Sequence, residues 1–183
     1  MKITRFTALS ALAAAALSSS AFAAPSASIT TPGLDFQQYS AGPVGDNDVN
    51  DDDTLYWIDE KLVSGIKSYL IFWDPYPAGT VGASITFDAP IVALITTQSG
   101  LMASEPTYGA AGITYNYDAT GFTGLEPLNT ATFAGNVLTI NWWAATPGDH
   151  IRVLTAVPEI SRLAMFALGL AAMGLAVQRR NRG

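Results

Sequence analysis

Short apolar and aromatic runs separated by turn residues are the feature that most constrains the fold of this chain. In the middle of the sequence such runs recur about every 8–12 residues, between segments rich in Gly, Pro, Asn and Asp. No part of this region carries a long apolar repeat with the 3.6-residue period of a helix. The pattern predicts an all-β domain, a single antiparallel β-sandwich of the jelly-roll or Greek-key kind. Strands are expected at residues 34–39, 54–58, 66–73, 83–87, 91–96, 112–117, 131–133, 137–143 and 151–157.

Two connections in this region have a predicted conformation. Gly135-Asn136 stands between two expected strands and predicts a tight hairpin, with the positive φ values of a primed turn. Residues 58–70 can form a helical turn or two, but Gly65 and the β-rich run after it argue against a longer helix.

The first 23 residues are typical of a secretory signal peptide. Lys2 and Arg5 supply the positive start, and an apolar run too short to span a membrane comfortably follows. Ala21 and Ala23 give the small-x-small pattern of a cleavage site, so we expect cleavage after Ala23. Residues 1–23 are therefore excluded from the predicted fold.

The other end of the chain also carries an apolar segment. Residues 163–177 contain no charge, and this 15-residue run would extend roughly 22 Å as a helix. Since a bilayer core needs about 20 apolar residues, flanking residues would complete a transmembrane helix at about 160–178. A basic cluster follows at once and predicts a cytoplasmic C-terminus: Arg179, Arg180 and Arg182.

The order of motif, apolar segment and basic cluster resembles the PEP-CTERM sorting domain of Gram-negative bacteria. The motif is Val157-Pro158-Glu159, with Ile160 in the place of the second proline, and the resemblance covers about the last 27 residues. It implies recognition by an exosortase, cleavage near the motif and transfer to the cell surface or extracellular matrix. An ordinary C-terminal anchor helix is the alternative. The stretches SYLIFWDP, ASITFDAPIVALIT and TPGDHIRVLTAVPE are similar to extracellular proteins of this type, which implies a small β-sandwich but no activity.

These segments predict a domain organisation and an address. We expect a signal peptide at 1–23, a β-sandwich at 24–156 and a sorting segment at 157–183. The expected partners are a Sec-type export machinery, an exosortase-like enzyme and, transiently, the inner membrane. The precursor would be anchored in that membrane, and the product would lie on the surface or in the matrix of a Gram-negative bacterium.

The charge of the body excludes some functions. Residues 24–159 hold three of the nine cations and all fifteen acids, a net charge of −12. Such a body should repel nucleic acid and suits solubility outside the cell or the binding of cations. The chain has no cysteine, which excludes disulfides, thiol catalysis and Cys-ligated zinc.

The densest group of acids is the segment GDNDVNDDDTLYWIDE. Its alternating oxygen donors are similar to a dockerin or EF-hand calcium loop, although Asp53 stands where glycine makes the turn and a strand is expected to follow. A solvated acidic loop is the other interpretation. The candidate Ca²⁺ ligands are Asp46, Asp48, Asn50, Asp52 and Asp59.

Three pairs of adjacent aromatic residues lie in the expected strands: Tyr56-Trp57, Phe72-Trp73 and Trp142-Trp143. Successive strand residues face opposite sides, so one ring of each pair should point away from the core. An outward ring can stack on a sugar or form a protein interface, or it can be covered by a loop or by a neighbouring strand. The candidate contact residues are Trp57, Trp73, Trp142 and Trp143.

Catalysis has little support in the sequence. The only histidine, His150, follows a Pro-Gly-Asp bend, and no Gly-x-Ser-x-Gly elbow or phosphate-binding loop occurs. Asp74 and Asp88 precede prolines closely and are expected to be turn residues. We therefore expect a non-enzymatic surface or matrix protein associated with exopolysaccharide or biofilm. A carbohydrate- or calcium-binding module is the alternative, and a matrix glycan hydrolase with two facing carboxyls is the third.

Overall fold

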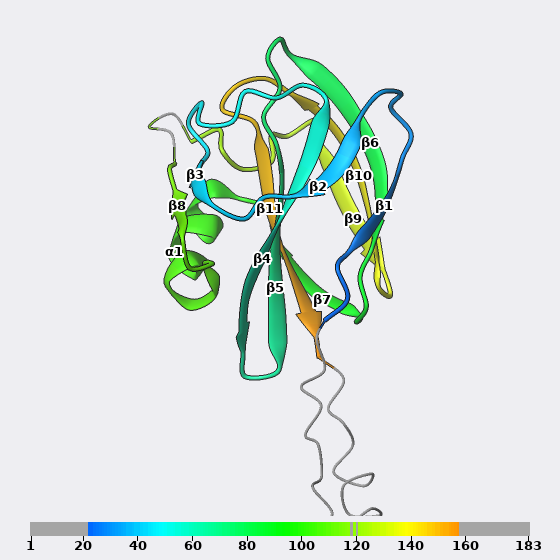
Figure 1. The fold of residues 1–183 in the computed structure, drawn as a ribbon, viewed down its shortest axis with the longest axis vertical. Helices are drawn as coiled ribbons and strands as arrows, with labels where there is room; N and C mark the ends of the chain where they lie inside the picture. The colour runs from blue at the N-terminus through cyan, green and yellow to red at the C-terminus, as the bar shows by residue number, and fades with distance from the viewer. Residues whose placement is uncertain (1–21, 118, 120, 158–183) are drawn as a thin grey trace, which may run out of the picture.

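The computed structural model describes residues 22–117, 119 and 121–157. The cleavage residue Ala21, the motif residues Pro158 and Glu159, the predicted membrane helix and the arginine cluster lie outside them. The described chain forms eleven strands and one helix (Figure 1). In chain order they are β1 Ser26–Ile29, β2 Asp35–Gln38, β3 Gly42–Val44, β4 Thr54–Val63, β5 Ile66–Trp73, β6 Gly79–Thr86, β7 Ile91–Ile95, α1 Gln98–Tyr108, β8 Ile113–Tyr115, β9 Thr130–Ala134, β10 Val137–Ala144 and β11 Asp149–Ala156.

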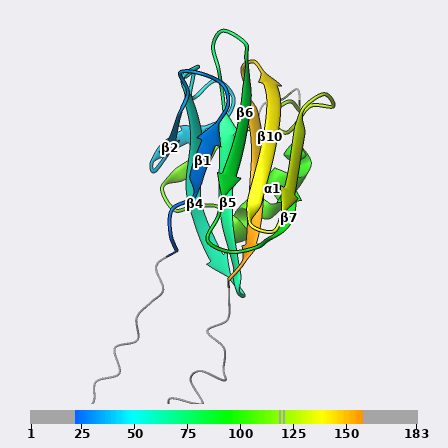
Figure 2. The ribbon, with the colours of Figure 1, turned by 90° about the vertical axis from the view of Figure 1, so that its right-hand side faces the viewer.

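Two sheets pack face to face: in Figure 1 the sheet with β6, β9 and β10 lies to the right of the sheet with β4, β5 and β11, and Figure 2 looks onto the first of them with the second behind it. One has four strands in the order β1-β6-β10-β9, and the other has five in the order β2-β4-β5-β11-β7. Alternate residues of each strand point between the sheets, as expected for a pleated backbone. In β10, for example, Leu138, Ile140 and Trp142 are buried in this main core, while the residues between them face outward.

The five-stranded sheet is covered on its other face as well. The short β3–β8 pair and α1 lie against it, which makes a third layer (Figure 1). Leu70 and Phe72 of β5 pack there against Val44 and Leu101. Burial on both faces explains why seven consecutive residues of β5, from Lys67 to Trp73, are buried.

A buried ion pair holds this third layer on the sheet. Arg152 of β11 donates from Nε to Glu60 Oε2 and from Nη2 to Glu60 Oε1, both at 2.7 Å. Its Nη1 donates to the Leu101 carbonyl at 2.9 Å and to the Ser104 hydroxyl, both in α1. Burial lowers the pKa of Arg152, but the hydrogen bonds and charge of Glu60 outweigh that effect and raise it. Arg152 therefore stays charged, and its hydrogen bonds connect β11 with β4 and α1.

The prediction of an all-β body is confirmed, and each of the nine predicted strands overlaps an observed one. Residues 58–70 form part of the β4–β5 hairpin rather than helical turns, with φ of 52° at Ser64 and 80° at Gly65 in the connection. The predicted hairpin at Gly135-Asn136 joins β9 to β10. Gly135 has a φ of 60° and Asn136 is not left-handed, the pattern expected of a type II′ turn.

Two strand pairs differ from the expectation of purely antiparallel pairing. β2 runs parallel to β4, and β3 runs parallel to β8. The chain between β2 and β4 covers residues 39–53, which is long enough to return to the starting end of the sheet. The strands β1, of four residues, and β3, of three, were not predicted.

The helix α1 was not predicted either. Thr97 caps its start by accepting a hydrogen bond from the Gly100 N–H at 3.2 Å. Leu101 is its one buried residue, and Pro106 lies inside it, so the segment lacks the apolar stripe from which a helix is usually recognised. Among the described residues no helix has the length and apolar character needed to cross a bilayer.

Candidate functional site

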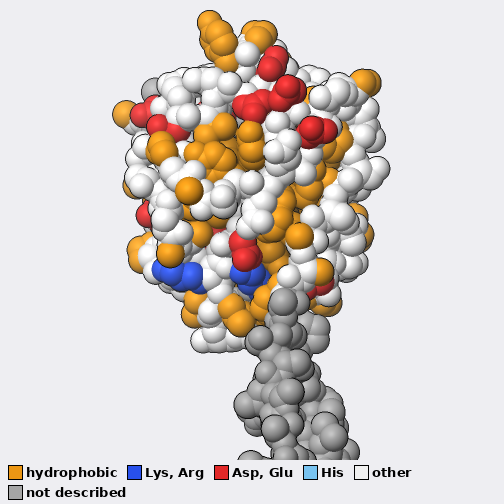
Figure 3. All heavy atoms as spheres, viewed as in Figure 1, with side chains coloured by type: hydrophobic (Ala, Val, Ile, Leu, Met, Phe, Trp, Pro, Cys, Tyr) orange, Lys and Arg blue, Asp and Glu red, His pale blue; other side chains and the backbone are white. Residues whose placement is uncertain are grey.

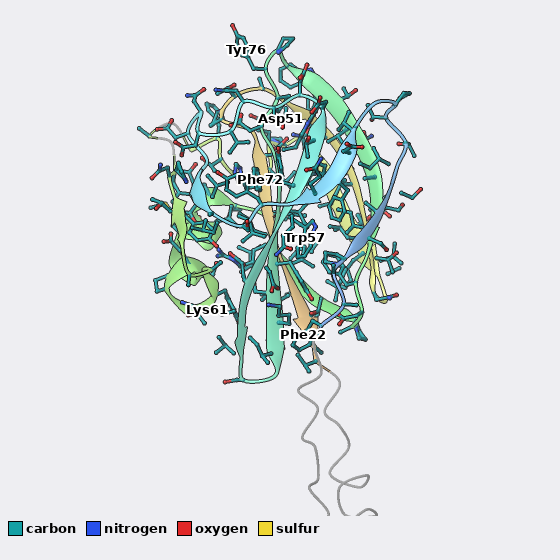
Figure 4. All side chains as sticks on the ribbon, viewed as in Figure 1. Phe22, Asp51, Trp57, Lys61, Phe72 and Tyr76 are labelled. Atoms are coloured by element: carbon teal, nitrogen blue, oxygen red, sulfur yellow. The ribbon has the colours of Figure 1, made fainter. Side chains whose placement is uncertain are left out.

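The described chain begins and ends at the same end of the domain. At one end, here called the terminal pole, the described chain both begins and ends beside the β4–β5 turn. The Phe22 ring lies 5.8 Å from Lys67 Nζ, and the Val157 N–H donates to the Gly65 carbonyl at 2.9 Å. Figure 4 shows Phe22 and Lys61 at this end and Asp51 and Tyr76 at the opposite end, the distal pole.

Acidic side chains gather toward the distal pole, and the visible lysines lie near the terminal pole (Figure 3). The distal pole is formed by the loop 45–53 and by the connections that join β5 to β6 and β10 to β11. The two ion pairs formed by described residues, Lys67 with Asp59 and Arg152 with Glu60, both lie away from the loop 45–53. The carboxylates of this loop therefore have no Lys or Arg partner within the described chain.

The loop 45–53 is held by a specific backbone conformation. Gly45, Asp46 and Asn47 have φ of 92°, 42° and 68°, three successive left-handed residues. An added Cβ at Gly45 would lie 2.0 Å from the Asn116 carbonyl oxygen, so no larger residue fits there. Asn116 Nδ2 also donates to Asp48 Oδ2 at 2.8 Å, which fixes the loop against the end of β8.

Two further side chains of the loop, those of Asn50 and Asp51, have defined partners. The Tyr56 hydroxyl donates to Asp51 Oδ2 at 2.6 Å. Asn50 Nδ2 donates to the Asn47 carbonyl at 3.1 Å, and Thr146 Oγ1 donates to Asn50 Oδ1 at 3.3 Å. The loop is therefore an ordered part of the distal pole.

The structure separates one predicted calcium ligand from the others. Asp46, Asp48, Asn50 and Asp52 lie in the loop, whereas Asp59 lies far along β4 and pairs with Lys67, Oδ1 to Nζ 2.6 Å. Across residues 22–117, 119 and 121–157, no three Asp, Glu, His or Cys side chains are grouped closely enough to hold a metal ion. Calcium binding by the loop stays a prediction.

Of the four tryptophans proposed as contact residues, only Trp143 is exposed to solvent, with 55% of the residue's surface accessible. Trp57, Trp73 and Trp142 are buried in the main core. The strand alternation holds, but the outward partners Tyr56 and Phe72 are covered by the third layer. Only β10, whose outer face is open, leaves its outward ring uncovered.

Trp143 belongs to a braced part of the distal pole. The Asn129 side chain makes two hydrogen bonds with the Trp143 backbone: Asn129 Nδ2 donates to the Trp143 carbonyl at 2.9 Å, and the Trp143 N–H donates to Asn129 Oδ1 at 2.7 Å. Asn129 Nδ2 also donates to Asp149 Oδ2 at 2.7 Å. Next to Asn129, Leu128 is 93% exposed. An open aromatic ring on a rigid strand end is suited to stacking against a flat apolar face.

Two buried aspartates at this pole were not predicted as site residues. Burial raises the pKa of Asp74 to about 6 and that of Asp149 to about 7. The Asn129 hydrogen bond partly offsets the effect at Asp149. In the sequence both residues stand beside proline or glycine and are indistinguishable from ordinary turn residues.

His150 is buried and its ring stacks on Phe72, with centroids 5.3 Å apart and planes 5° apart. Because Asp149 precedes it directly on β11, the two side chains point to opposite faces of the sheet. The pair seen in the sequence is therefore not arranged as an interacting dyad.

Two hollows lie next to each other, since Gln38 and Asp59 line both of them. One, of about 170 Å³, is lined by residues that include Phe22, Trp57 and Tyr69, and the other, of about 310 Å³, by residues that include Tyr39 and Ile58. Asp59 is the one carboxyl that lines each of them.

Comparison of the chain with protein-family models, with curated proteins and with solved structures finds no match.

Proposed function

We propose that this chain is an exported surface or matrix protein with a non-catalytic β-sandwich body of jelly-roll or Greek-key type. It is sorted through its PEP-CTERM-like segment and displays its distal pole toward exopolysaccharide. The observation that carries the proposal is the polarity of the domain. The described chain starts and stops at the terminal pole, where both predicted targeting segments attach, and Trp143 and the acidic loop lie opposite.

This arrangement suits a domain that is held by its ends and binds with its far side. While either apolar segment is in a membrane, the terminal pole faces the lipid and the distal pole faces outward. The high negative charge of the body keeps such a domain soluble and away from anionic lipid headgroups.

The sorting step is tested by the intact mass of protein recovered from the cell surface. A product that begins at Ala24 and ends near Glu159 supports export and exosortase-like processing. A double variant, Pro158→Ala with Glu159→Ala, should accumulate in the membrane fraction, whereas Ser161→Ala serves as the matched control. Surface protein that retains Arg182 would show a plain anchor and refute the sorting proposal.

The alternative of a carbohydrate-binding module is favoured by one observation, the exposed ring of Trp143. Trp143→Ala should weaken binding to the exopolysaccharide of the producing cells tenfold or more and change thermal unfolding little, because more than half of this residue's surface is exposed. Phe133→Ala is the control, since Phe133 is an exposed aromatic near the other end of the same sheet. Equal binding by all three proteins would exclude Trp143 as a glycan contact.

A further inference from the structure

The most unusual polar side chain at the distal pole is that of Asp74, directly after β5. Only 1% of its surface is exposed, and neither carboxylate oxygen has a hydrogen-bond partner of normal geometry among the described residues. A buried carboxylate without a partner is costly, by an amount that usually forces a compensating interaction. Asp74 therefore indicates an interaction that the protein side chains around it do not supply.

The surroundings of Asp74 show what its carboxylate faces. The Asp48 carboxylate and the Val49 N–H both act on its pKa, the first raising and the second lowering it, so the side chain points toward the loop 45–53. The Asp51 N–H donates to the Asp74 carbonyl at 2.9 Å and holds the loop over it. On the other side, an added Cβ at Gly148 would lie 2.8 Å from Asp74 Cβ. The side chain is thus confined beneath the loop.

No protein cation within the described chain balances this charge. Arg152 is bound to Glu60 and Lys67 to Asp59, and Lys61 lies at the terminal pole. The loop that lies over Asp74 carries the carboxylate of Asp48 and the amide oxygen of Asn50, which accepts a hydrogen bond from Thr146. Carboxylate and amide oxygens are ligands that a hard divalent cation takes.

We propose that Asp74 and Asp48 together bind one Ca²⁺ ion beneath the loop 45–53. The remaining ligands come from loop oxygens and water. This assignment differs from the sequence-based ligand set because it adds Asp74, from the end of β5, and has no role for Asp52 or Asp59. It does not rest on the proposed export and sorting function, since a cation would bind this pole wherever the protein resides.

The experiment uses the full chain in mild detergent, stripped with EDTA, and measures thermal unfolding and calorimetric titration with CaCl₂. We expect 10 mM Ca²⁺ to raise the midpoint by about 5–10 °C, as a site with a dissociation constant of about 0.1–1 mM would do. Matched ionic strength in NaCl is the control for charge screening. A midpoint that does not move with Ca²⁺, or that moves equally with NaCl, would overturn the proposal.

Variants identify the ligands. Asp74→Asn and Asp48→Asn should each weaken Ca²⁺ binding at least tenfold, and Asp52→Asn, which changes an exposed acid of the same loop, should weaken it less than threefold. Asp48 is exposed, so its variant tests the site even where Asp74→Asn perturbs folding. Loss of binding in Asp52→Asn equal to that in Asp48→Asn would place the ion on the outer loop and refute the role of Asp74.

Discussion

Removing Arg152 is expected to be the most damaging single change in the described domain. Arg152→Met keeps much of the side-chain length but deletes both bonds to Glu60 and both bonds to α1. Glu60 keeps hydrogen bonds from Ser68, at 2.5 Å, and from Tyr115, at 2.8 Å, yet becomes a buried charge without a counter-ion. Breaking a buried pair from one side costs about 3–5 kcal/mol.

The assay is thermal and urea unfolding at pH 7. In a domain of this size, a loss of 3–5 kcal/mol lowers the midpoint by about 12–20 °C, at about 4 °C for each kcal/mol. Lys61→Met, at an exposed lysine, is the control and should change the free energy of unfolding by less than about 0.5 kcal/mol. Hydrogen exchange should also show faster opening of α1 in Arg152→Met, because Leu101 and Ser104 lose their contact with β11.

A double variant separates the charge effect from lost packing. Glu60→Gln with Arg152→Met removes both charges and leaves an amide that still accepts from Ser68 and Tyr115. We expect it to regain about half of the lost stability, since the uncompensated charge is gone. A loss of under 1 kcal/mol in Arg152→Met, or no recovery in the double variant, would show that the pair is not what holds the third layer.

Three further predictions follow from the glycines and the buried acids. Gly148→Ala should destabilise the domain by about 3 kcal/mol or more in chemical unfolding, because the added Cβ would lie 2.6 Å from the Trp73 carbonyl oxygen. Gly65→Ala is the control: Gly65 has a similar φ but no atom within 4 Å of the added Cβ, so this change should cost only about 1–2 kcal/mol. The pKa of Asp149 is about 7 in the folded protein, against 3.8 ordinarily, so between these values the native state binds a proton that the unfolded state has lost. The free energy of unfolding should therefore fall by about 1–4 kcal/mol as the pH rises from 4 to 8. Asp149→Asn should flatten this dependence in urea unfolding, and an unchanged slope would contradict the raised pKa of Asp149. If Ca²⁺ displaces the proton of Asp74, with a pKa of about 6, calorimetry should show binding about tenfold weaker at pH 5 than at pH 7, whereas a pH-independent affinity would exclude this carboxylate as a ligand.

The sequence was sufficient to predict much of the secondary structure. The run at 66–73 matches β5 residue for residue, and Gly135-Asn136 identified the β9–β10 hairpin, because local turn chemistry and strand preference act over a few residues. It was not sufficient for α1, whose start depends on the Thr97 cap and whose packing rests on one leucine. A helix without an apolar stripe has no periodic signal to read.

The candidate sites show the same division. The sequence identified the acidic loop, the absence of cysteine and the adjacent aromatic rings, all of which are matters of composition and spacing. Strand alternation also fixed which rings lie on opposite faces, but it could not say whether a face is covered. Only the packing of α1 and the β3–β8 pair buries Phe72, and only the open outer face of β10 leaves Trp143 exposed.

Asp74 illustrates what the tertiary structure alone decided. In the sequence it is an aspartate before a proline, and nothing in its neighbours distinguishes it from a solvated turn residue. Its burial arises because the loop 45–53, more than twenty residues earlier in the chain, folds over the end of β5 and is fixed there by Asn116 and Thr146. Composition and local pattern determine which strands and charges exist, whereas desolvation depends on contacts between distant segments and is set only when the layers pack together.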